Sequence, residues 1–321
     1  MKIVVLDAGT LNFNSSAWAE MAEIGELILH EHTASDEATI AQSISGADAV
    51  FTNKVPLCGD VLRNAKALKF IGVLATGYNI IDIEVAQLMG QTVCNVPGYS
   101  TASTSQHAIA LILELCNQVG HHSQSVHGGD WVRSRYFSYW HSAPRELASM
   151  TVGIVGFGTI GRRVATVLDA MGATILASAR RPRDKPGYSG FEWVTNEEIF
   201  KRADLVSLHC PETPENSGFV NADLLRSMRP GALLVNTARG GLIDEQALAD
   251  SLNSGHLAGA AVDVLRHEPM RSDCPLLGVD RCIVTPHIAW ASEPARLRLI
   301  KASVDQLRAF LNEKPYNVVL G

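Results

Sequence analysis

Short, unbroken apolar runs alternate with helix-like segments along the chain, and this alternation restricts the fold more than any other feature. In the first hundred residues the runs fall at 3–6, 27–30, 49–52, 70–74 and 92–96. Parallel strands that are covered on both faces have continuous apolar sequences, and helices such as 36–44 and 83–89 would supply the cover. This stretch predicts a flavodoxin-like, three-layer α/β unit with a doubly wound parallel sheet.

A second series of the same kind begins at Thr151. Its apolar runs fall at 152–155, 174–177, 205–208, 233–235, 258–262 and 283–285. We expect a long helix over 101–119 before this series, a less regular segment over 121–149, and a last helix over 292–311. The chain of 321 residues is therefore expected to contain two doubly wound α/β domains.

Composition and charge narrow the functional classes. The chain is 46% hydrophobic and 19% charged, which suffices for two cores and excludes disorder as the main state. Its formal net charge of −6 argues against nucleic acid or an anionic membrane as the main partner. The six cysteines show no CxxC spacing, so we expect a reducing compartment and no structural zinc site. The amino terminus does not look like a signal peptide, and the longest apolar stretch, 108–113, cannot span a membrane, so the expected location is cytoplasmic.

A glycine-rich motif opens the second series. Gly156-Phe157-Gly158-Thr159-Ile160-Gly161 directly follows the strand expected over 151–155 and precedes a helix expected over 162–171. Within a complete βαβ unit this spacing indicates a dinucleotide site: the first glycine allows the tight turn, the second admits a pyrophosphate, and the third lets the helix pack closely. The phosphates would meet the free N–H groups of the helix. A plain tight turn is the alternative interpretation.

The end of the next strand bears on the choice of nucleotide. An NAD site commonly places Asp or Glu there, on the ribose 2′-hydroxyl. Here the sequence reads Ala177-Ser178-Ala-Arg180-Arg181-Pro-Arg183, and the first acid is Asp184. Arg and Ser can bind a 2′-phosphate that a carboxylate would repel, so we expect NADP(H). NAD(H) stays possible if these arginines only form a solvated loop.

Polar side chains collect at the carboxyl ends of the later strands, where ligands of parallel sheets bind. These ends read His209-Cys210-Pro211, Thr237-Ala238-Arg239-Gly240, Asp263 and Pro286-His287, with Glu268 in the loop after Asp263. An Arg, a Glu and a His on successive strand ends beside a cofactor site suit the reduction of a carbonyl group. One such residue alone would commonly be a surface residue.

Each of these residues has a distinct expected task. His287 would supply the proton that the carbonyl oxygen needs, since His is suited to proton transfer at neutral pH. Glu268 would orient His287 and favour its protonated form. Arg239 would hold a substrate carboxylate and polarise the carbonyl. Asp263 would meet the nicotinamide end of the cofactor, whereas Cys210 is expected to be structural because hydride transfer needs no covalent step.

Taken together, these motifs resemble the D-isomer-specific 2-hydroxyacid dehydrogenase family, and within it the glycerate dehydrogenase/hydroxypyruvate reductase group. The resembling stretches are 72–79, 95–97, 156–161, 235–240, 263–269 and 285–289. The resemblance implies that Arg239, Glu268 and His287 are catalytic, with His287 as acid/base. It also implies that backbone N–H groups of Thr76 and Gly77 bind the substrate carboxylate, and the turn Ala75-Thr-Gly77 after a strand can form such an anion-binding nest.

The resemblance further implies an architecture. A Rossmann cofactor domain over 99–290 is inserted into a flavodoxin-like substrate domain formed by 1–98 and 291–321, and the active site is the cleft that a hinge motion closes. The substrate is a small anionic 2-keto or D-2-hydroxy acid, with glyoxylate and hydroxypyruvate to be tested first, and the assembly is a homodimer joined through the cofactor domain. The expected cofactor contacts comprise Thr104, Gly156, Phe157, Gly158, Thr159, Ile160, Gly161, Ser178, Arg180, Arg181, His209, Cys210, Pro211, Thr237, Ala238, Arg239, Asp263, His287 and Ala289.

Each of three further features of the sequence has two interpretations. Lys54 would add positive charge for an anionic substrate, and a solvated lysine is the alternative. The resemblance makes Trp140 a candidate to reach the substrate of the partner subunit, and packing at the dimer interface alone is the alternative. The histidines at 121, 122 and 127 allow a metal site, but no carboxylate or Cys accompanies them at useful spacing, so a polar helix end is preferred and no metal is expected.

Two functions compete with an NADP(H)-dependent reductase. One is the same reaction with NAD(H). The other is a nucleotide-sensing, corepressor-like binding protein, because relatives of that kind keep the same Arg–Glu–His set; the chain lacks the long basic or disordered extension that suits regulatory assemblies. Formate oxidation fits poorly, since formate has no hydroxyl group to deprotonate and a Glu268–His287 pair would lack a purpose.

Overall fold

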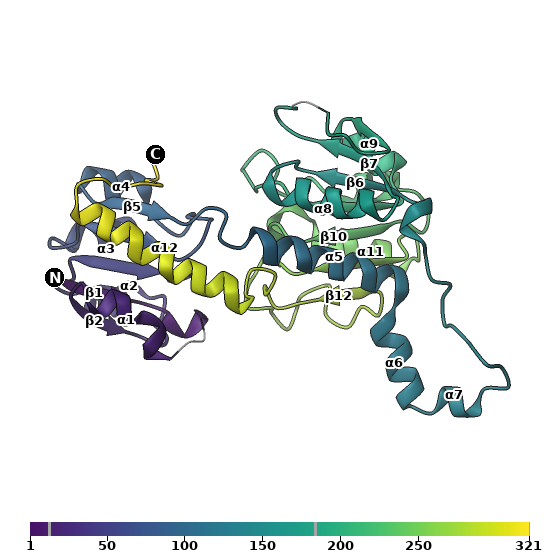
Figure 1. Ribbon diagram of the computed structural model, residues 1–321, viewed down its shortest axis with the longest axis horizontal. Helices are drawn as coiled ribbons and strands as arrows, with labels where there is room; N and C mark the ends of the chain where they lie inside the picture. Colours follow the sequence, from purple (N-terminus) through teal and green to yellow (C-terminus); the bar gives the residue numbers. More distant parts are fainter. Residues whose placement is uncertain (12–13, 183–184, 321) are drawn as a thin grey trace. The chain divides into compact units, whose positions relative to one another are not determined.

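The computed structural model describes residues 1–11, 14–182 and 185–320, so Arg183 and Asp184 of the expected nucleotide-selecting segment lie outside the described residues. It divides the chain into two compact units. The terminal unit consists of Met1–Ser100 and Ala291–Gly321, and the central unit of Thr101–Trp290 (Figure 1). Both are α/β units built on parallel sheets, which confirms the predicted fold class.

The terminal unit has a five-stranded sheet of order β2-β1-β3-β4-β5, with every described strand pair parallel. Its strands are β1 (Lys2–Val5), β2 (Glu26–Leu29), β3 (Ala49–Thr52), β4 (Phe70–Val73) and β5 (Thr92–Asn95). Its helices are α1 (Ala19–Ala22), α2 (Glu37–Ser43), α3 (Gly59–Asn64), α4 (Ile83–Leu88) and α12 (Glu293–Leu311). Neighbouring residues of a strand point to opposite faces, so Ile71 packs in the core with α2, α3 and α4 while the Phe70 ring lies 5.1 Å from that of Phe310 in α12.

The central unit has a seven-stranded sheet of order β12-β11-β10-β9-β6-β7-β8, again parallel throughout its described pairs. Its strands are β6 (Thr151–Val155), β7 (Thr174–Ser178), β8 (Phe191–Trp193), β9 (Leu205–Leu208), β10 (Leu233–Asn236), β11 (Gly259–Val262) and β12 (Cys282–Val284). The direction of winding reverses between β6 and β9, which is where doubly wound sheets bind their ligands.

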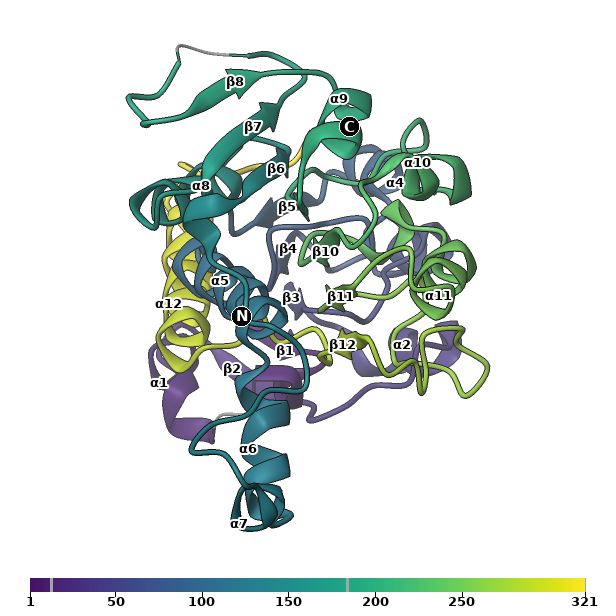
Figure 2. The same cartoon turned by 90° about the vertical axis from the view of Figure 1, so that its right-hand side faces the viewer.

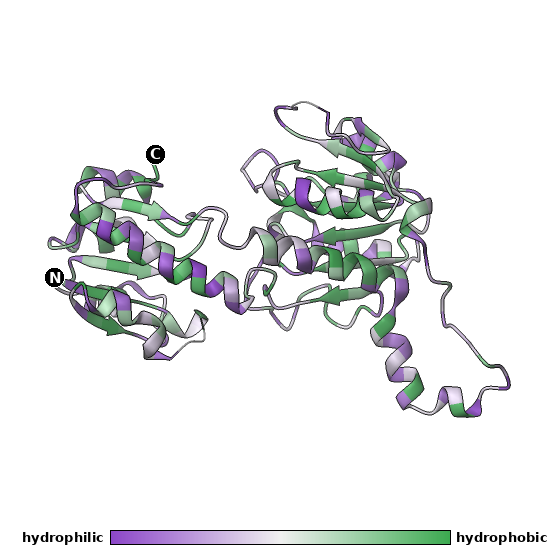
Figure 3. Cartoon of the chain, in the orientation of Figure 1, coloured by the Kyte–Doolittle hydropathy of each residue, from purple (hydrophilic) through white to green (hydrophobic). Residues whose placement is uncertain are grey.

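Helices cover both faces of this sheet (Figure 2). The bounds are α5 (Thr101–Asn117), α8 (Thr159–Ala170), α9 (Asn196–Arg202), α10 (Ala222–Ser227) and α11 (Glu245–Asn253). One core joins α5 and α8 to the sheet, and a second joins α9, α10 and α11 to its other face. The inner strands are accordingly mostly apolar, and Figure 3 shows much of this sheet in green.

The sequence-based description of this unit was wrong in three places. The segment expected to be irregular contains α6 (Val119–His127) and α7 (Asp130–Arg133), neither of which buries a residue, so no apolar periodicity marks them. The strand β8 was missed because it has three residues at the sheet edge. Helix α8 begins at Thr159 rather than Arg162, which places Gly161 inside the helix.

Short connections complete the chain. The 3-10 turns are Ala8–Leu11, Ser15–Trp18, Leu147–Ser149 and Gly240–Leu242. Several helices begin at a side chain that accepts the N–H three residues on, as Asp36 does for α2 and Asp244 for α11. In the described part of the chain, no helix combines the length and apolar character needed to cross a membrane.

Candidate active site

The turn between β6 and α8 is shaped by two glycines. Gly156 has φ +95°, and a Cβ atom there would lie 2.6 Å from backbone atoms of His209 and Cys210. At Gly161 a Cβ would lie 2.2 Å from the carbonyl oxygen of Gly156, so the helix approaches the turn too closely for any side chain. By contrast, a Cβ at Gly158, the residue that precedes α8, meets no atom within 4 Å. The turn thus leaves open space at the helix N-terminus, where the first backbone N–H groups lack intrahelical partners.

A large cavity of about 1810 Å³ lies over this turn. It is bounded by the carboxyl ends of β6, β7 and β9. The expected cofactor contacts that line it are Gly156, Phe157, Gly158, Thr159, Ser178, Arg180, Arg181, His209, Cys210 and Pro211. Its lining includes four arginines and two glutamates, so the net positive charge of the lining favours an anionic ligand.

Two of those arginines belong to α8 and two follow β7. The Arg162 guanidinium lies 4.8 Å from the centre of the Phe157 ring, an arrangement that a cation–π attraction stabilises. Arg180 and Arg181 are exposed at the end of β7 and line the cavity. They are therefore available to a negatively charged group at this end of the cavity.

Helix α9 adds residues to the cavity that the sequence did not reveal. The Ser178 hydroxyl donates to Asn196 Oδ1 at 2.5 Å, and both residues line the cavity together with Glu197. A capping box at Thr195 and Glu198 starts this helix and so fixes their position. Because α9 follows the unpredicted strand β8, only the tertiary structure brings this carboxylate near the arginines.

His209 is held neutral at the floor of the cavity. Its imidazole Nε2 lies 2.9 Å from Ser207 Oγ, and burial lowers its pKa to about 4. The charged form would lose hydration there without gaining an acidic partner. At neutral pH the side chain is therefore an uncharged hydrogen-bonding group.

This burial predicts a dependence of stability on pH. His209 has an ordinary pKa near 6.5 in the unfolded chain, so its contribution is complete above that pH and falls as the pH drops toward 4. Urea unfolding of the nucleotide-free protein should show a loss of about 2 kcal/mol between pH 7.5 and pH 5 that His209→Asn lacks. Equal losses in the parent and the variant would contradict the assignment, because the remaining histidines are common to both.

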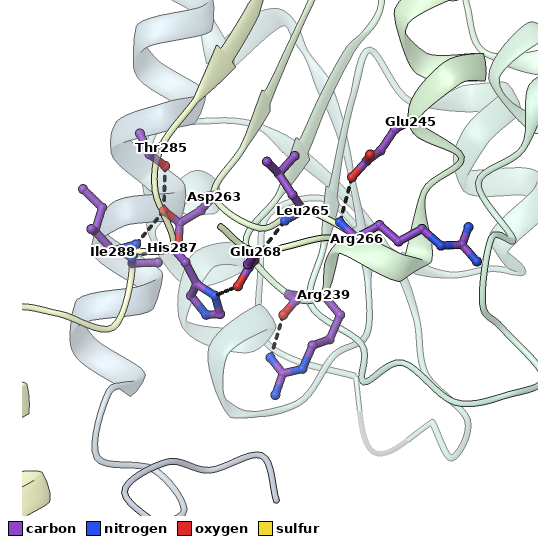
Figure 4. Close-up of polar contacts among 11 residues, drawn as sticks. Arg239, Glu245, Asp263, Leu265, Arg266, Glu268, Thr285, His287 and Ile288 are labelled. Atoms are coloured by element: carbon purple, nitrogen blue, oxygen red, sulfur yellow. Dashed lines mark hydrogen bonds and ion pairs between the residues drawn. The ribbon is translucent and has the colours of Figure 1, made fainter. Parts of the chain in front are cut away.

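Glu268 and His287 come together at the edge formed by the carboxyl ends of β11 and β12 (Figure 4). His287 Nδ1 lies 2.6 Å from Glu268 Oε2, and the second carboxylate oxygen accepts the N–H of Leu265 at 2.9 Å. The two side chains are 26% and 32% exposed, so they are shielded yet reachable. Because Nδ1 donates to the carboxylate, the imidazole presents Nε2 to a ligand.

Arg239 follows β10 at the same edge but does not join this pair. Its guanidinium Nη1 donates to the carbonyl of Ala238 at 2.7 Å (Figure 4). The side chain is exposed, and the side-chain amide of Asn236 holds the turn by donating from Nδ2 to the Arg239 carbonyl at 2.8 Å. The structure thus brings two of the three expected catalytic side chains into contact and leaves the third at the surface nearby.

Asp263 is buried beneath the loop that carries His287. It is 1% exposed, and its carboxylate accepts the backbone N–H groups of Ile288 and Ala289 at 2.9 and 2.8 Å. Thr285 Oγ1 donates to the same carboxylate at 2.6 Å. Asp263 therefore organises the loop that carries His287, and its contact with the nicotinamide stays a prediction.

The remaining expected cofactor contacts do not line the cavity. Thr104, Thr237, Ala289 and Gly161 are buried in the central unit, and Ala238 and Ile160 are half-buried. Thr237 Oγ1 is buried without a hydrogen-bond partner among the described residues. An orphaned hydroxyl at the end of β10 and an open glycine cradle at α8 both fit a bound dinucleotide.

The expected substrate residues of the terminal unit lie at the carboxyl ends of its own strands. Asp7, which is 2% exposed, accepts the N–H groups of Asn53 at 2.8 Å and Lys54 at 2.6 Å, so it fixes the loop after β3. Burial raises the pKa of Asp7 although these bonds oppose the shift. Lys54 is exposed in this loop.

The anion nest was expected in the turn after β4. Ala75 and Gly77 are half-buried, and Thr76 Oγ1 donates to the Val96 carbonyl at 3.0 Å while the Thr76 carbonyl accepts from Asn95 at 2.6 Å. In the described part of the chain, the N–H groups of Thr76 and Gly77 have no partner. Free N–H groups on successive residues are the donors that an anion-binding turn needs.

The segment after α5 is strongly exposed. Trp140 is 63%, Phe137 91% and Trp131 51% exposed, and Trp131 Nε1 donates to the Phe137 carbonyl at 3.0 Å. His121 and His122 lie near the ring of His141, but no described group of three such side chains could hold a metal ion. Exposed apolar patches are typical of surfaces that bind other molecules.

Comparison with known proteins defines the class. Residues 109–289 match the family described as "D-isomer specific 2-hydroxyacid dehydrogenase, NAD binding domain". Together with the relatives below, this match shows that the chain belongs to the D-isomer specific 2-hydroxyacid dehydrogenase family, whose members are oxidoreductases that act on the CH–OH group of donors.

Among its relatives, a hydroxypyruvate reductase of Blautia hydrogenotrophica is 41% identical over 99% of this chain and 99% of its own length. A glycerate dehydrogenase of Methylorubrum extorquens is 35% identical over 99% of this chain and 98% of its own. The structure is also similar to an NADPH-dependent glyoxylate/hydroxypyruvate reductase of Sinorhizobium meliloti in complex with NADP and malonate, with a TM-score of 0.84, 27% identity, and coverage of 99% of this chain and 96% of that one.

Proposed function

We propose that the protein is an NADP(H)-dependent reductase of small 2-keto acids, which it converts to D-2-hydroxy acids. The observation that carries the proposal is the 2.6 Å contact between His287 Nδ1 and Glu268 Oε2 on the same sheet as the open glycine cradle. Membership of the family and the activities for which these relatives are named support glyoxylate and hydroxypyruvate as the first substrates to test.

The proposed chemistry assigns the proton to His287. A reduced nucleotide, when bound, supplies the hydride for the keto carbon. As negative charge develops on the carbonyl oxygen, His287 donates a proton from Nε2, while Glu268 keeps Nδ1 hydrogen-bonded and stabilises the positive imidazole. The imidazole then regains its proton from solvent, so one hydride and one proton have been added to the keto acid.

The substrate is proposed to bind as an anion. Arg239 would form paired hydrogen bonds with the carboxylate, for which its exposed guanidinium must leave the Ala238 carbonyl. The free N–H groups of Thr76 and Gly77 are proposed to bind the same class of anion, and Lys54 to add positive charge. The positive charges of Arg239 and Lys54, together with the free N–H groups of Thr76 and Gly77, favour binding of a keto acid over a neutral ketone.

The proposed preference for NADP(H) rests on Arg180 and Arg181 at the end of β7. A guanidinium binds the 2′-phosphate of NADP with paired hydrogen bonds. Glu197 on the same cavity wall favours the second candidate, NAD(H), because a carboxylate can accept from the ribose 2′-hydroxyl. Because the cavity lining has four arginines and only two glutamates, its net charge is positive, and NADP(H) is the stronger candidate.

An enzyme assay tests both parts of this proposal. Oxidation of NADPH and NADH is followed by absorbance with glyoxylate, hydroxypyruvate, pyruvate and 2-ketoisocaproate. We expect turnover with the first two acids and a higher kcat/KM with NADPH than with NADH. A protein that binds the nucleotide but reduces none of the acids would instead be a nucleotide-binding regulator.

Exchanging Arg180 for aspartate should reverse the nucleotide preference. The substitution removes a cation and adds an anion beside the proposed 2′-phosphate, so kcat/KM with NADPH should fall about 10- to 100-fold and that with NADH should change less. Arg226→Asp makes the same charge change on α10, away from the cavity, and should leave the ratio unaltered. An unchanged ratio in Arg180→Asp would show that Arg180 does not contact the nucleotide.

We further propose that the protein is a homodimer joined through the central unit. The exposed aromatic residues Trp131, Phe137 and Trp140 support this, since a second copy would cover them. Trp140 has two candidate roles in such a dimer, packing at the interface and a place near the partner's substrate. Light scattering should give about twice the 34.6 kDa chain mass, and a monomer would contradict the proposal.

A further inference from the structure

The loop that carries His287 has an unusual backbone conformation. His287 has φ +53°, in the left-handed region that few residues other than glycine adopt without support. Its N–H is shared between the carbonyls of Asp263 at 2.8 Å and Thr285 at 2.9 Å. The direction of the imidazole therefore depends on whatever holds residues 285–289 in place.

Asp263 holds that loop from the sheet side. Its carboxylate accepts the N–H groups of the two residues after His287, Ile288 and Ala289, and the hydroxyl of Thr285. Burial alone would raise the pKa of Asp263, but hydrogen bonds from His107, Thr285, Ala289 and Ile288 outweigh burial and hold it below its usual value. The Asp263 carboxylate is thus an anion that accepts hydrogen bonds from residues before and after His287 in the loop.

Helix α5 holds the loop from the other side. His107 Nε2 lies 3.1 Å from Thr285 Oγ1 and 3.4 Å from Asp263 Oδ1. The single hydroxyl hydrogen of Thr285 points to Asp263, so Thr285 can only accept from His107, and the His107 nitrogen must carry a hydrogen. One helical turn earlier, Ser103 Oγ donates to the Ala289 carbonyl at 2.7 Å.

We propose that His107 is a positioning residue for the reaction, whose Nε2–H keeps the 285–289 loop in the conformation that directs His287 at Glu268. His107 transfers no proton in this scheme: its Nε2–H is committed to Thr285 and Asp263. The proposal rests on the proposed function, because positioning matters only if His287 is the proton donor. It also explains why a polar residue lies on the sheet-facing side of α5, which the sequence alone did not indicate.

The test compares three variants with the parent. His107→Leu removes the donor, His107→Gln keeps an N–H donor of similar reach, and Thr285→Val removes the hydroxyl that links His107 to Asp263. His256→Leu is the matched control, since His256 is half-buried in the same unit and contacts the Leu225 carbonyl at 3.2 Å, away from the loop. Its thermal midpoint shows what the loss of one half-buried imidazole contact costs.

In the activity assay, His107→Leu and Thr285→Val should lower kcat for hydroxypyruvate reduction by about 10- to 100-fold, because a misplaced donor loses efficiency steeply. The Kd for NADPH should change by less than about threefold, and the thermal midpoint should shift no more than in His256→Leu. His107→Gln should restore most of kcat. A general loss of stability would instead affect kcat and nucleotide binding together and would not be rescued.

A second measurement does not depend on turnover. Hydrogen exchange of the amides of Ile288 and Ala289, which donate to Asp263, should be about 10-fold faster in His107→Leu than in the parent and close to the parent in His107→Gln. Unchanged exchange in His107→Leu would overturn the positioning role. If the parent reduces no keto acid but exchange still responds, the proposed function fails while the structural link between His107 and the loop stands.

Discussion

Replacement of His287 by alanine is expected to lower kcat for keto-acid reduction by about 10²- to 10⁴-fold, the range by which a positioned general acid contributes. The side chain donates to Glu268 and lies outside the cavity over the glycine turn, so the Kd for NADPH should stay within about threefold of the parent. Stopped-flow absorbance gives the first quantity and quenching of intrinsic fluorescence gives the second.

Glu268→Gln is the informative companion variant. An amide oxygen can still accept from His287 Nδ1, but it carries no charge to stabilise a positive imidazole, so the loss should be smaller, about 10- to 100-fold. Adding imidazole to His287→Ala should recover part of the rate, because a soluble donor can occupy the vacated space. Comparable rates in the parent and His287→Ala would refute the assignment of the proton to His287.

A pair of glycine variants should separate folding from nucleotide binding. Gly161→Ala places a Cβ 2.2 Å from the Gly156 carbonyl oxygen, and neither backbone can move without opening the β6–α8 junction. We expect a loss of about 3 kcal/mol or more in the free energy of unfolding and a thermal midpoint lowered by roughly 10 °C. Differential scanning calorimetry of the nucleotide-free protein measures both.

Gly158→Ala makes the same chemical change three residues upstream of Gly161. Its Cβ meets no protein atom within 4 Å, so the thermal midpoint should stay within about 2 °C of the parent. The same methyl group would project into the space proposed for the pyrophosphate, and the Kd for NADPH should rise about 10-fold or more. A Gly158→Ala protein that binds NADPH normally would show that the phosphates lie elsewhere.

Much of the fold could be predicted because its strands are buried on both faces. The strands β3 and β9 coincide with the predicted runs at 49–52 and 205–208, where continuous apolar sequence leaves little choice. The edge strand β8 and the exposed helix α6 could not be found, since neither has a face whose burial imposes a pattern. Elements that are buried on both faces could thus be predicted from the sequence, whereas edge strands and exposed helices could not.

The site shows the same division. Glu268 and His287 were paired because both follow strands of one sheet, and the structure brings them into contact. The contribution of His107 could not be predicted, since it comes from a helix 178 residues away from Thr285 and depends on which face of α5 meets the sheet. The place of Glu197 in the cavity lining could not be predicted for a related reason, because it depends on the positions of β8 and α9.

The left-handed backbone at His287 has a consequence for protein engineering. β-branched residues at this position would be strained whatever their chemistry, whereas asparagine and glycine adopt the conformation readily. A saturation library at position 287 would therefore mix variants that lack a proton donor with variants whose loop has been displaced. Asparagine is the replacement that removes acid–base chemistry while respecting the backbone, and it is the proper baseline against which every other variant in such a library should be ranked.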